Sequence, residues 1–164
     1  MRARQFPSPP CIVREYKAPD FETLYAIDQL CYPRAVAYTR AELRWYIGLA
    51  GGKCLVAEMR RSERAPAIAG FAVTIARGTR GHIITMDVVE AHRRKGVGSA
   101  LLREAETQMA YRGVQEIRLE TAVDNIAGIA FWKQHDYHVR GRLAHYYPNG
   151  TDAFAMSKFL QPSR

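Results

Sequence analysis

One stretch of the chain, Met86–Leu102 (MDVVEAHRRKGVGSALL), constrains the fold more than any other. An apolar, strand-like run passes through a basic turn, and a helical pattern follows two glycines that are one residue apart. Glycine at positions 96 and 98 permits positive φ and lets an oxygen-rich group approach the main chain closely. The stretch therefore predicts a junction between a strand and a helix that begins at an open turn.

The same junction is suited to an anion. The first N–H groups of a helix are unpaired and lie at the positive end of its dipole, so a helix N-terminus attracts phosphate. Arg93, Arg94 and Lys95 add positive charge at the rim. A P-loop is excluded because G-x-x-x-x-G-K-S/T is absent, and the dinucleotide fingerprint is excluded because Leu101 replaces its third glycine. Spacing alone leaves open an ordinary turn whose basic residues are merely solvated.

The remaining apolar and polar periodicity places this junction among further strands and helices. Asp20 and Thr39 are expected to be N-cap residues, and Thr39 with Glu42 has the spacing of a capping box. The order β-α-α-β-β-β-α-β-α-β-β predicts a mixed α/β (α+β) fold, a sheet flanked by helices. The expected strands cover 11–16, 53–59, 67–76, 82–89, 114–121, 137–143 and 152–159, and the expected helices cover 20–32, 39–50, 98–112 and 125–135.

Length and composition fit one globular domain over residues 1–164, with residues 1–9 as a flexible N-terminal tail. Apolar residues make up 48% and charged residues 24%, and no run approaches the roughly 18 apolar residues that cross a bilayer. The N-terminus is not typical of a secretory signal. Three widely spaced cysteines without a metal or redox pair indicate reduced thiols, and we expect a cytoplasmic location without membrane binding.

The net charge of +8 permits nucleic acid or an anionic cofactor as a partner and identifies neither. The basic residues are spread along the chain, whereas a dedicated nucleic-acid surface clusters them among aromatic residues. We therefore expect no stable nucleic-acid binding and no metal, and a monomer or weak homodimer.

Two blocks of the sequence resemble the GNAT family of acetyltransferases. The first is R-x-x-G-x-G followed by SALL, and the second is RLETAVDNIAGIAFWKQHDY, residues 118–137. The resemblance implies the GNAT acyl-CoA N-acyltransferase fold, a mostly antiparallel mixed sheet with about four helices, and acetyl-CoA as cosubstrate. In the family, main chain of the fourth strand binds the pantetheine and loop amides hold the pyrophosphate. The cofactor site it implies consists of Met86, Val88, Val89, Arg93, Arg94, Lys95, Gly96, Val97, Gly98, Ser99, Asn125, Ala130, Trp132 and Lys133.

The tail AHYYPNGTDAFAM is similar to protein N-terminal acetyltransferases, including ribosomal-protein alanine acetyltransferases. The resemblance implies that Tyr146 and Tyr147 close over the first residues of an acceptor peptide. The loop CYPRAVAYT falls where the family has its other substrate wall, so Tyr32, Pro33 and Tyr38 are further candidates. The alternative is that the tyrosines only pack, with their hydroxyls in water. We expect that alternative for Tyr32 and Tyr38 and the substrate role for the Tyr146–Tyr147 pair.

Glu120 is the first candidate for the general base, because the ribosomal-protein enzymes carry a glutamate at this place. Without the resemblance, Glu120 reads as a solvent-facing strand carboxylate. His82 is the second candidate, since it matches a position where some eukaryotic relatives use a tyrosine and its ordinary pKa suits proton relay. The alternative is that His82 is an ordinary surface residue. Asp87 alternates onto the same face as Thr85 and is expected to be structural.

The chain departs from the family pattern at two places. Trp132 replaces the tyrosine that protonates the leaving thiolate, and indole N–H is not a practical acid. Asp136-Tyr137 replaces the usual glycine-aromatic pair after the last helix. We expect an enzyme that acetylates the α-amine of a protein or peptide. The alternatives are an acetyltransferase for a small-molecule amine, a weakly active or non-catalytic acyl-CoA-binding module, and a basic nucleic-acid binder.

Overall fold

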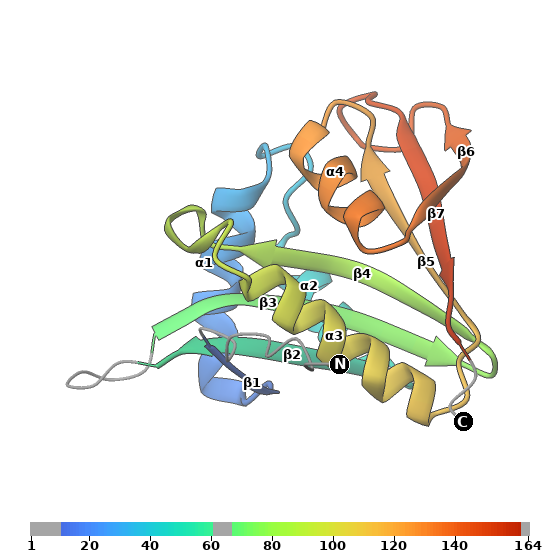
Figure 1. The fold of residues 1–164 in the computed structure, drawn as a ribbon. Helices are drawn as coiled ribbons and strands as arrows, with labels where there is room; N and C mark the ends of the chain where they lie inside the picture. The colour runs from blue at the N-terminus through green and yellow to red at the C-terminus, as the bar shows by residue number, and fades with distance from the viewer. Residues whose placement is uncertain (1–10, 61–66, 162–164) are drawn as a thin grey trace.

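The computed structural model describes residues 11–60 and 67–161, and it is built on one seven-stranded sheet. The strand order is β1-β2-β3-β4-β5-β7-β6, and every neighbouring pair is antiparallel except β4 and β5 (Figure 1). The strands are β1 (Cys11–Glu15), β2 (Gly52–Met59), β3 (Ala67–Arg77), β4 (Arg80–Val88), β5 (Glu116–Ala122), β6 (His138–Leu143) and β7 (Ala153–Phe159).

Four α-helices flank the sheet: α1 (Phe21–Cys31), α2 (Arg40–Ile47), α3 (Val97–Tyr111) and α4 (Ile126–Gln134). Short 3₁₀ turns, Ala18–Asp20 and Glu90–His92, precede α1 and follow β4. The predicted order of elements and the mixed, mostly antiparallel fold are confirmed.

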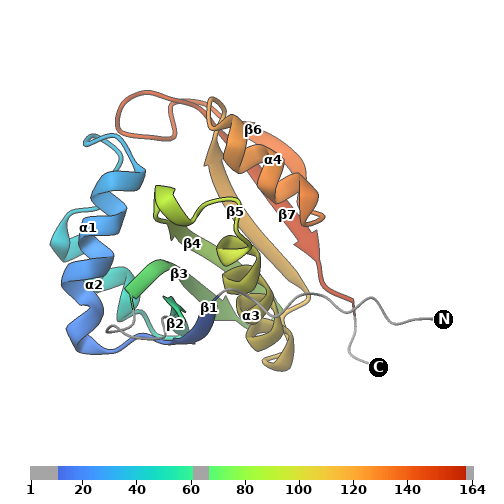
Figure 2. The ribbon, with the colours of Figure 1, turned by 60° about the vertical axis from the view of Figure 1, so that its left-hand side comes forward.

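The helices form two layers with the sheet between them (Figure 2). Helices α1 and α2 bury Phe21, Leu24 and Leu43 against one face, together with Phe71 of β3. Helix α3 buries its apolar stripe against the other face, where Trp132 of α4 joins the same cluster. Each strand of the centre is therefore covered on both sides, which accounts for the continuous apolar runs of β2 and β3.

Strands β4 and β5 pair over a short length and then diverge (Figure 1). Their parallel register covers Arg80–His82 against Glu116–Arg118 only. A register shift against β3 leaves Ile84 as the extra residue on β4, which is a β-bulge. Because a bulge bends its strand, β4 leaves β5 beyond His82, and the main chain of β4 is open on that side.

The helix ends correct several predictions. Thr39 and Glu42 do form the capping box, since Thr39 Oγ1 accepts the Glu42 N–H at 3.2 Å and Glu42 Oε2 accepts the Thr39 N–H at 2.8 Å. Asp20 stands at the N-cap position of α1, but its carboxylate accepts bonds from Lys17 and Arg14 instead of capping that helix. Helix α2 ends at Ile47 with Gly48 as C-cap, three residues before the predicted end at 50.

The tail expected over residues 1–9 and most of the turn expected over 60–66 lie outside the described residues. β2 and β3 are antiparallel neighbours, as the predicted hairpin requires. No helix in the described part of the chain is long and apolar enough to cross a membrane.

Candidate active site

The loop between β4 and α3 has a positive φ at Gly96, whereas Gly98 has none and lies within α3, which begins one residue earlier than expected. Gly96 is the N-cap of α3 with φ of 84°, and Arg94 also has a positive φ of 58°. The first helical bond runs from the Ala100 N–H to the Gly96 carbonyl at 3.0 Å. The amides of the first turn before Ala100 therefore point along the axis without a helical acceptor, which is the arrangement that binds an anion.

Two basic side chains of this loop form hydrogen bonds to nearby main-chain carbonyls. Arg93 Nε donates to the Val88 carbonyl at 2.9 Å, and its Nη2 lies 3.6 Å from Cys31 Sγ on α1. Lys95 Nζ donates to the Ala91 carbonyl at 2.8 Å. Arg93 and Lys95 thus hold the loop in shape while keeping their charges close to the α3 N-terminus.

The main chain at the end of β4 has one free edge. The Val89 N–H donates to the Ala69 carbonyl of β3, and the Val89 carbonyl accepts the His92 N–H, both at 2.8 Å. The Val89 N–H, a single donor, is therefore engaged within the sheet, while its carbonyl keeps a second lone pair. In an antiparallel ladder the neighbouring residue turns its groups the other way, so Met86 and Val88 face the side of β5. The Val88 carbonyl already accepts Arg93 Nε at 2.9 Å, which leaves the Val88 N–H and the main-chain groups of Met86 on that side.

The start of α3 packs closely against α4. A Cβ added to Gly98 would lie 3.2 Å from the Phe131 ring, so glycine allows the two helices to approach. Ser99 Oγ and His135 Nε2 are 2.9 Å apart. Burial lowers the pKa of His135, which favours the neutral ring at this contact. Sequence analysis missed His135, because nothing local links it to a serine 36 residues away.

Helix α4 places the second predicted block. Asn125 caps it, with Oδ1 accepting the Gly128 N–H at 3.0 Å, while Ala130 and Lys133 lie on its exposed surface. Trp132 is only 8% exposed and packs edge-on against Tyr137 with ring centroids 5.5 Å apart. The indole that replaces the family's tyrosine is therefore a core side chain.

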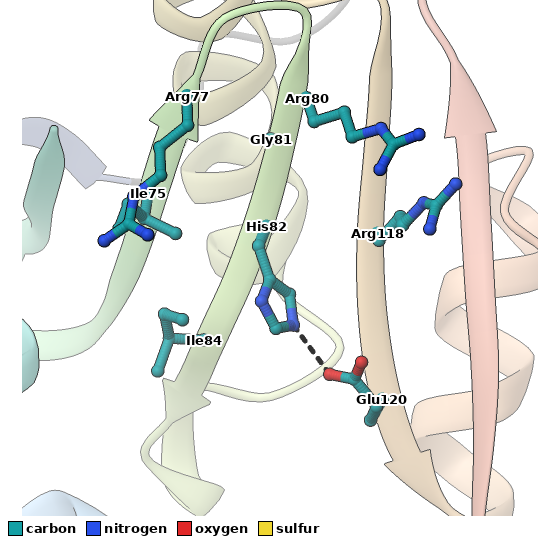
Figure 3. A pocket seen from close by; sticks show the side chains of 8 residues that line it. All are labelled: Ile75, Arg77, Arg80, Gly81, His82, Ile84, Arg118 and Glu120. Carbon is teal, nitrogen blue, oxygen red and sulfur yellow. Dashed lines mark hydrogen bonds and ion pairs between the residues drawn. The ribbon is translucent and has the colours of Figure 1, made fainter. Parts of the chain in front are cut away.

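The two predicted proton acceptors form a pair. His82 Nε2 of β4 and Glu120 Oε2 of β5 are 2.6 Å apart, and both side chains are partly exposed (Figure 3). Neither side chain stands alone at the surface, since each has the other as its partner. They line an open pocket of about 430 Å³ on the face covered by α1 and α2. The pair stands where β4 and β5 begin to diverge.

Tyrosines from three segments gather near this pair. Tyr146 and Tyr147 contact each other edge-on, with centroids 5.0 Å apart. Burial and the nearby Glu120 carboxylate raise the pKa of Tyr146 to about 12, and burial with the charges of Tyr146 and Glu120 raises that of Tyr147 to about 12. The Tyr38 ring lies 5.0 Å from that of Tyr46 on α2, a residue that sequence analysis missed.

The loop after α1 supplies the other predicted wall. Pro33 is exposed, and its carbonyl accepts the Val36 N–H at 2.8 Å. The Tyr32 hydroxyl lies 3.4 Å from Thr85 Oγ1, and burial raises the pKa of Tyr32 well above its ordinary range. Tyr32 packs as expected, but the expectation that its hydroxyl lies in water is wrong.

Beneath this loop lies a buried pair of carboxyl groups that sequence analysis missed. Asp28 of α1 is 0% exposed and Asp87 of β4 is 1% exposed. Asp28 Oδ2 accepts the Tyr38 N–H at 2.8 Å, and Thr85 Oγ1 donates to Asp87 Oδ1 at 2.8 Å. The structural role expected for Asp87 fits this network. The available signal for Asp28 was a carboxylate at the apolar spacing of Leu24, Asp28 and Cys31.

Curated relatives resemble part of the chain. It is 42% identical over 82 residues to N-alpha-acetyltransferase 30 of Schizosaccharomyces pombe, covering 49% of this chain and 55% of the relative. It is 36% identical over 83 residues to N-alpha-acetyltransferase MAK3 of Arabidopsis thaliana, covering 51% and 43%. The chain therefore spans about half the length of the curated relatives it matches.

Solved structures resemble nearly all of the chain. Ard1 from Thermoplasma volcanium has a TM-score of 0.82 at 26% identity, covering 93% of this chain and 99% of that one. A ribosomal-protein alanine N-acetyltransferase from Escherichia coli has a TM-score of 0.78 at 21% identity, covering 94% and 96%, which supports the fold alone. The sequence profile of the acetyltransferase (GNAT) family matches residues 21–137, more than half of the chain. This match, on a fold with the expected junction, shows that the chain belongs to the GNAT family of acetyltransferases.

Proposed function

We propose that this protein transfers the acetyl group of acetyl-CoA to the N-terminal α-amine of a protein or peptide. The observation that carries the proposal is the 2.6 Å contact between His82 and Glu120, placed where β4 and β5 diverge and beside the tyrosines of the acceptor side. The names of the relatives, N-alpha-acetyltransferases and Ard1, support the same class of acceptor.

The residues that line the divergence fit acetyl-CoA. The free amides at the start of α3, with Gly96 in a left-handed conformation, are suited to the diphosphate. The open edge of β4 offers the main-chain groups of Met86 and the Val88 N–H to an extended amide-containing arm, as a neighbouring strand would. We assign no cofactor bond to the Val89 amide, which donates to Ala69.

The reaction is aminolysis of a thioester. The amine nitrogen attacks the carbonyl carbon, the C–N bond forms, the C–S bond breaks, and the thiolate takes up a proton while the amine gives one up. An α-amine has an ordinary pKa of about 7.7–8.0, so roughly a tenth is neutral at pH 7. The His82–Glu120 pair supplies the proton acceptor, and most of the remaining rate enhancement comes from positioning.

Trp132 is unsuited to act as the acid for the leaving group, because it is buried in the core and indole N–H is not acidic. A thiol with a pKa of about 8.5 is a tolerable leaving group without one. Ser99 and His135 lie at the start of α3 and do not replace that acid in this proposal.

We treat residues 1–164 as a single acetyltransferase domain. The protein acts in the cytoplasm as a monomer or weak homodimer, without stable nucleic-acid binding. Tyr146 and Tyr147 form one wall over the acceptor, and the loop with Pro33 and Tyr38 forms the other.

The test is an assay of the full chain with acetyl-CoA and peptides that differ in their first residue. Thiol release is followed, and mass spectrometry locates the acetyl group. Glu120→Gln keeps the shape but removes the base, so kcat/KM is expected to fall by about 10²-fold or more while acetyl-CoA still binds. Glu104→Gln on α3, whose carboxylate bonds Gln108, is the matched control. The proposal fails if no peptide is acetylated at its α-amine, or if only small amines are.

A further inference from the structure

The pocket beside the His82–Glu120 pair continues along the sheet toward the β3–β4 hairpin. Its other end is lined by Arg77 of β3, Arg80 of β4 and Arg118 of β5 (Figure 3). This stretch of the pocket has no role in the chemistry proposed above. We infer that the three arginines select acceptor peptides that carry acidic side chains directly after the reacting residue, which rests on the proposed function.

The placement of these arginines follows from strand geometry. Arg80 is two residues from His82 on β4, and Arg118 is two residues from Glu120 on β5. Side chains at i and i+2 lie on the same face of a strand, about 6.6 Å apart along it. The arginines therefore lie on the same face of the sheet as the proton acceptors and within reach of the same bound peptide.

The positive charge at this end is only partly balanced. Arg118 Nη2 lies 2.8 Å from Glu116, whose charge also acts on Arg80, and Glu120 is committed to His82. Within residues 11–60 and 67–161, Arg77 and Arg80 form no ion pair. The three arginines thus share the two carboxylates of Glu116 and Glu120, so this end of the pocket keeps a net positive charge.

An extended peptide is long enough to reach from the His82–Glu120 pair to Arg80 and Arg118. Each residue of an extended chain advances about 3.3–3.6 Å. With the α-amine at the His82–Glu120 pair, the side chains of the second to fourth residues come level with Arg80 and Arg118. Carboxylates there would pair with guanidinium groups, which present donors in a fork that suits two carboxylate oxygens.

The same charges also act on the reacting amine. Nearby positive charge disfavours a protonated amine and lowers its pKa. The arginines therefore increase the neutral fraction of the α-amine and disfavour acceptors with lysine or arginine at the following positions. The first effect favours every acceptor, whereas the second separates acidic from basic acceptors.

The test compares three peptides with one shared first residue and either three glutamates, three alanines or three lysines at the following positions. The full chain is assayed at saturating acetyl-CoA. We expect kcat/KM to follow the order glutamate, alanine, lysine, with about a three- to tenfold step from alanine to glutamate, which lies within the range for two exposed ion pairs. Raising the salt concentration should shrink that step.

Variants then assign the preference to the pocket. Arg77→Gln with Arg80→Gln should bring the three peptides to within about twofold of one another. Arg103→Gln, an exposed arginine on α3, should keep the preference. Equal melting temperatures of the variants establish that the fold is intact. Equal kcat/KM for the glutamate and alanine peptides, or a preference that survives the double substitution, overturns this inference and leaves the proposed function standing. If no peptide is acetylated, the proposed function is overturned together with the inference.

Discussion

Two buried carboxyl groups couple the acceptor loop to the sheet. The charge of Asp28 helps to raise the pKa of Asp87, and Asp28 Oδ1 and Asp87 Oδ2 have no hydrogen-bond partner among the described residues. We expect a single proton between them to satisfy both oxygens, since two adjacent buried carboxylates do not both ionise. Asp28 Oδ2 also accepts the Tyr38 N–H, so Asp28 ties the loop that carries Tyr32 and Tyr38 to this buried site.

This pair predicts a pH dependence of stability. Burial raises the pKa of Asp87 and of Asp28 in the folded protein. The folded state therefore keeps a proton that the unfolded chain releases above its ordinary aspartate pKa of about 3.9. The stabilising contribution is fully present below that value and is lost as the pH rises through the raised folded pKa. Asp87→Asn keeps a hydrogen bond to Asp28 without the proton and should flatten this decline.

The measurement is denaturant unfolding of the parent and of Asp87→Asn at about pH 5 and about pH 8. The parent should lose more free energy of unfolding between the two than the variant does. Asp124→Asn, an exposed aspartate, serves as the control and should behave as the parent. Identical declines in all three proteins would contradict the shared proton.

Asp136 occupies a backbone conformation that suits glycine. Its φ is 67°, in the left-handed region, at the turn between α4 and β6 where the family has glycine. An L-residue with a Cβ is strained there by roughly 1–2 kcal/mol, less for aspartate than for most. Asp136→Gly is therefore expected to raise the free energy of unfolding by about 0.5–1 kcal/mol.

Chemical denaturation of this variant beside Asp124→Gly tests the argument. Asp124 does not have a positive φ, so glycine there relieves no strain and should be neutral or destabilising. A lower stability of Asp136→Gly than of the parent would show that the aspartate makes a contact worth more than the strain.

At the scale of single elements, the start of α3 depends on one glycine. Gly96 has φ of 84° as the N-cap, so an alanine there is strained. Gly96→Ala should lower the free energy of unfolding by about 1–2 kcal/mol and weaken acetyl-CoA binding in calorimetry, since the first-turn amides would shift. Gly141→Ala on β6, where an added Cβ meets nothing within 4 Å, should change neither quantity by much. Unchanged acetyl-CoA affinity in Gly96→Ala would contradict the role of this turn.

Across the whole molecule, β4 and β5 join two parts of the sheet by a short parallel contact. Only Arg80–His82 and Glu116–Arg118 are paired there. A ligand seated at the divergence contacts both parts and binds only the folded state, so it stabilises the protein by mass action. At 100 times its Kd, acetyl-CoA should add about 2.7 kcal/mol and raise Tm by roughly 5–11 °C. A thermal shift assay checks this, and an unchanged Tm at saturating acetyl-CoA would contradict binding at this place.

The order of elements was predictable because its signals are local. The capping box joins Thr39 to Glu42 within one helical turn, and the strands show apolar runs that need no partner to be recognised. The errors also have local causes: Gly48 ends α2 earlier than Gly51, and Asp20 bonds Arg14 across the turn.

The amino-acid sequence by itself determined the succession of strands and helices, the glycine turn before α3, and membership of the GNAT family, because periodicity, caps and motifs act over a few residues. Only the tertiary structure decided that His82 meets Glu120 across 38 residues, that Ser99 meets His135 across 36, and that Asp28 shares a buried site with Asp87. Such contacts depend on how β4 bends away from β5 and how α1 covers the sheet, and no local pattern specifies that geometry.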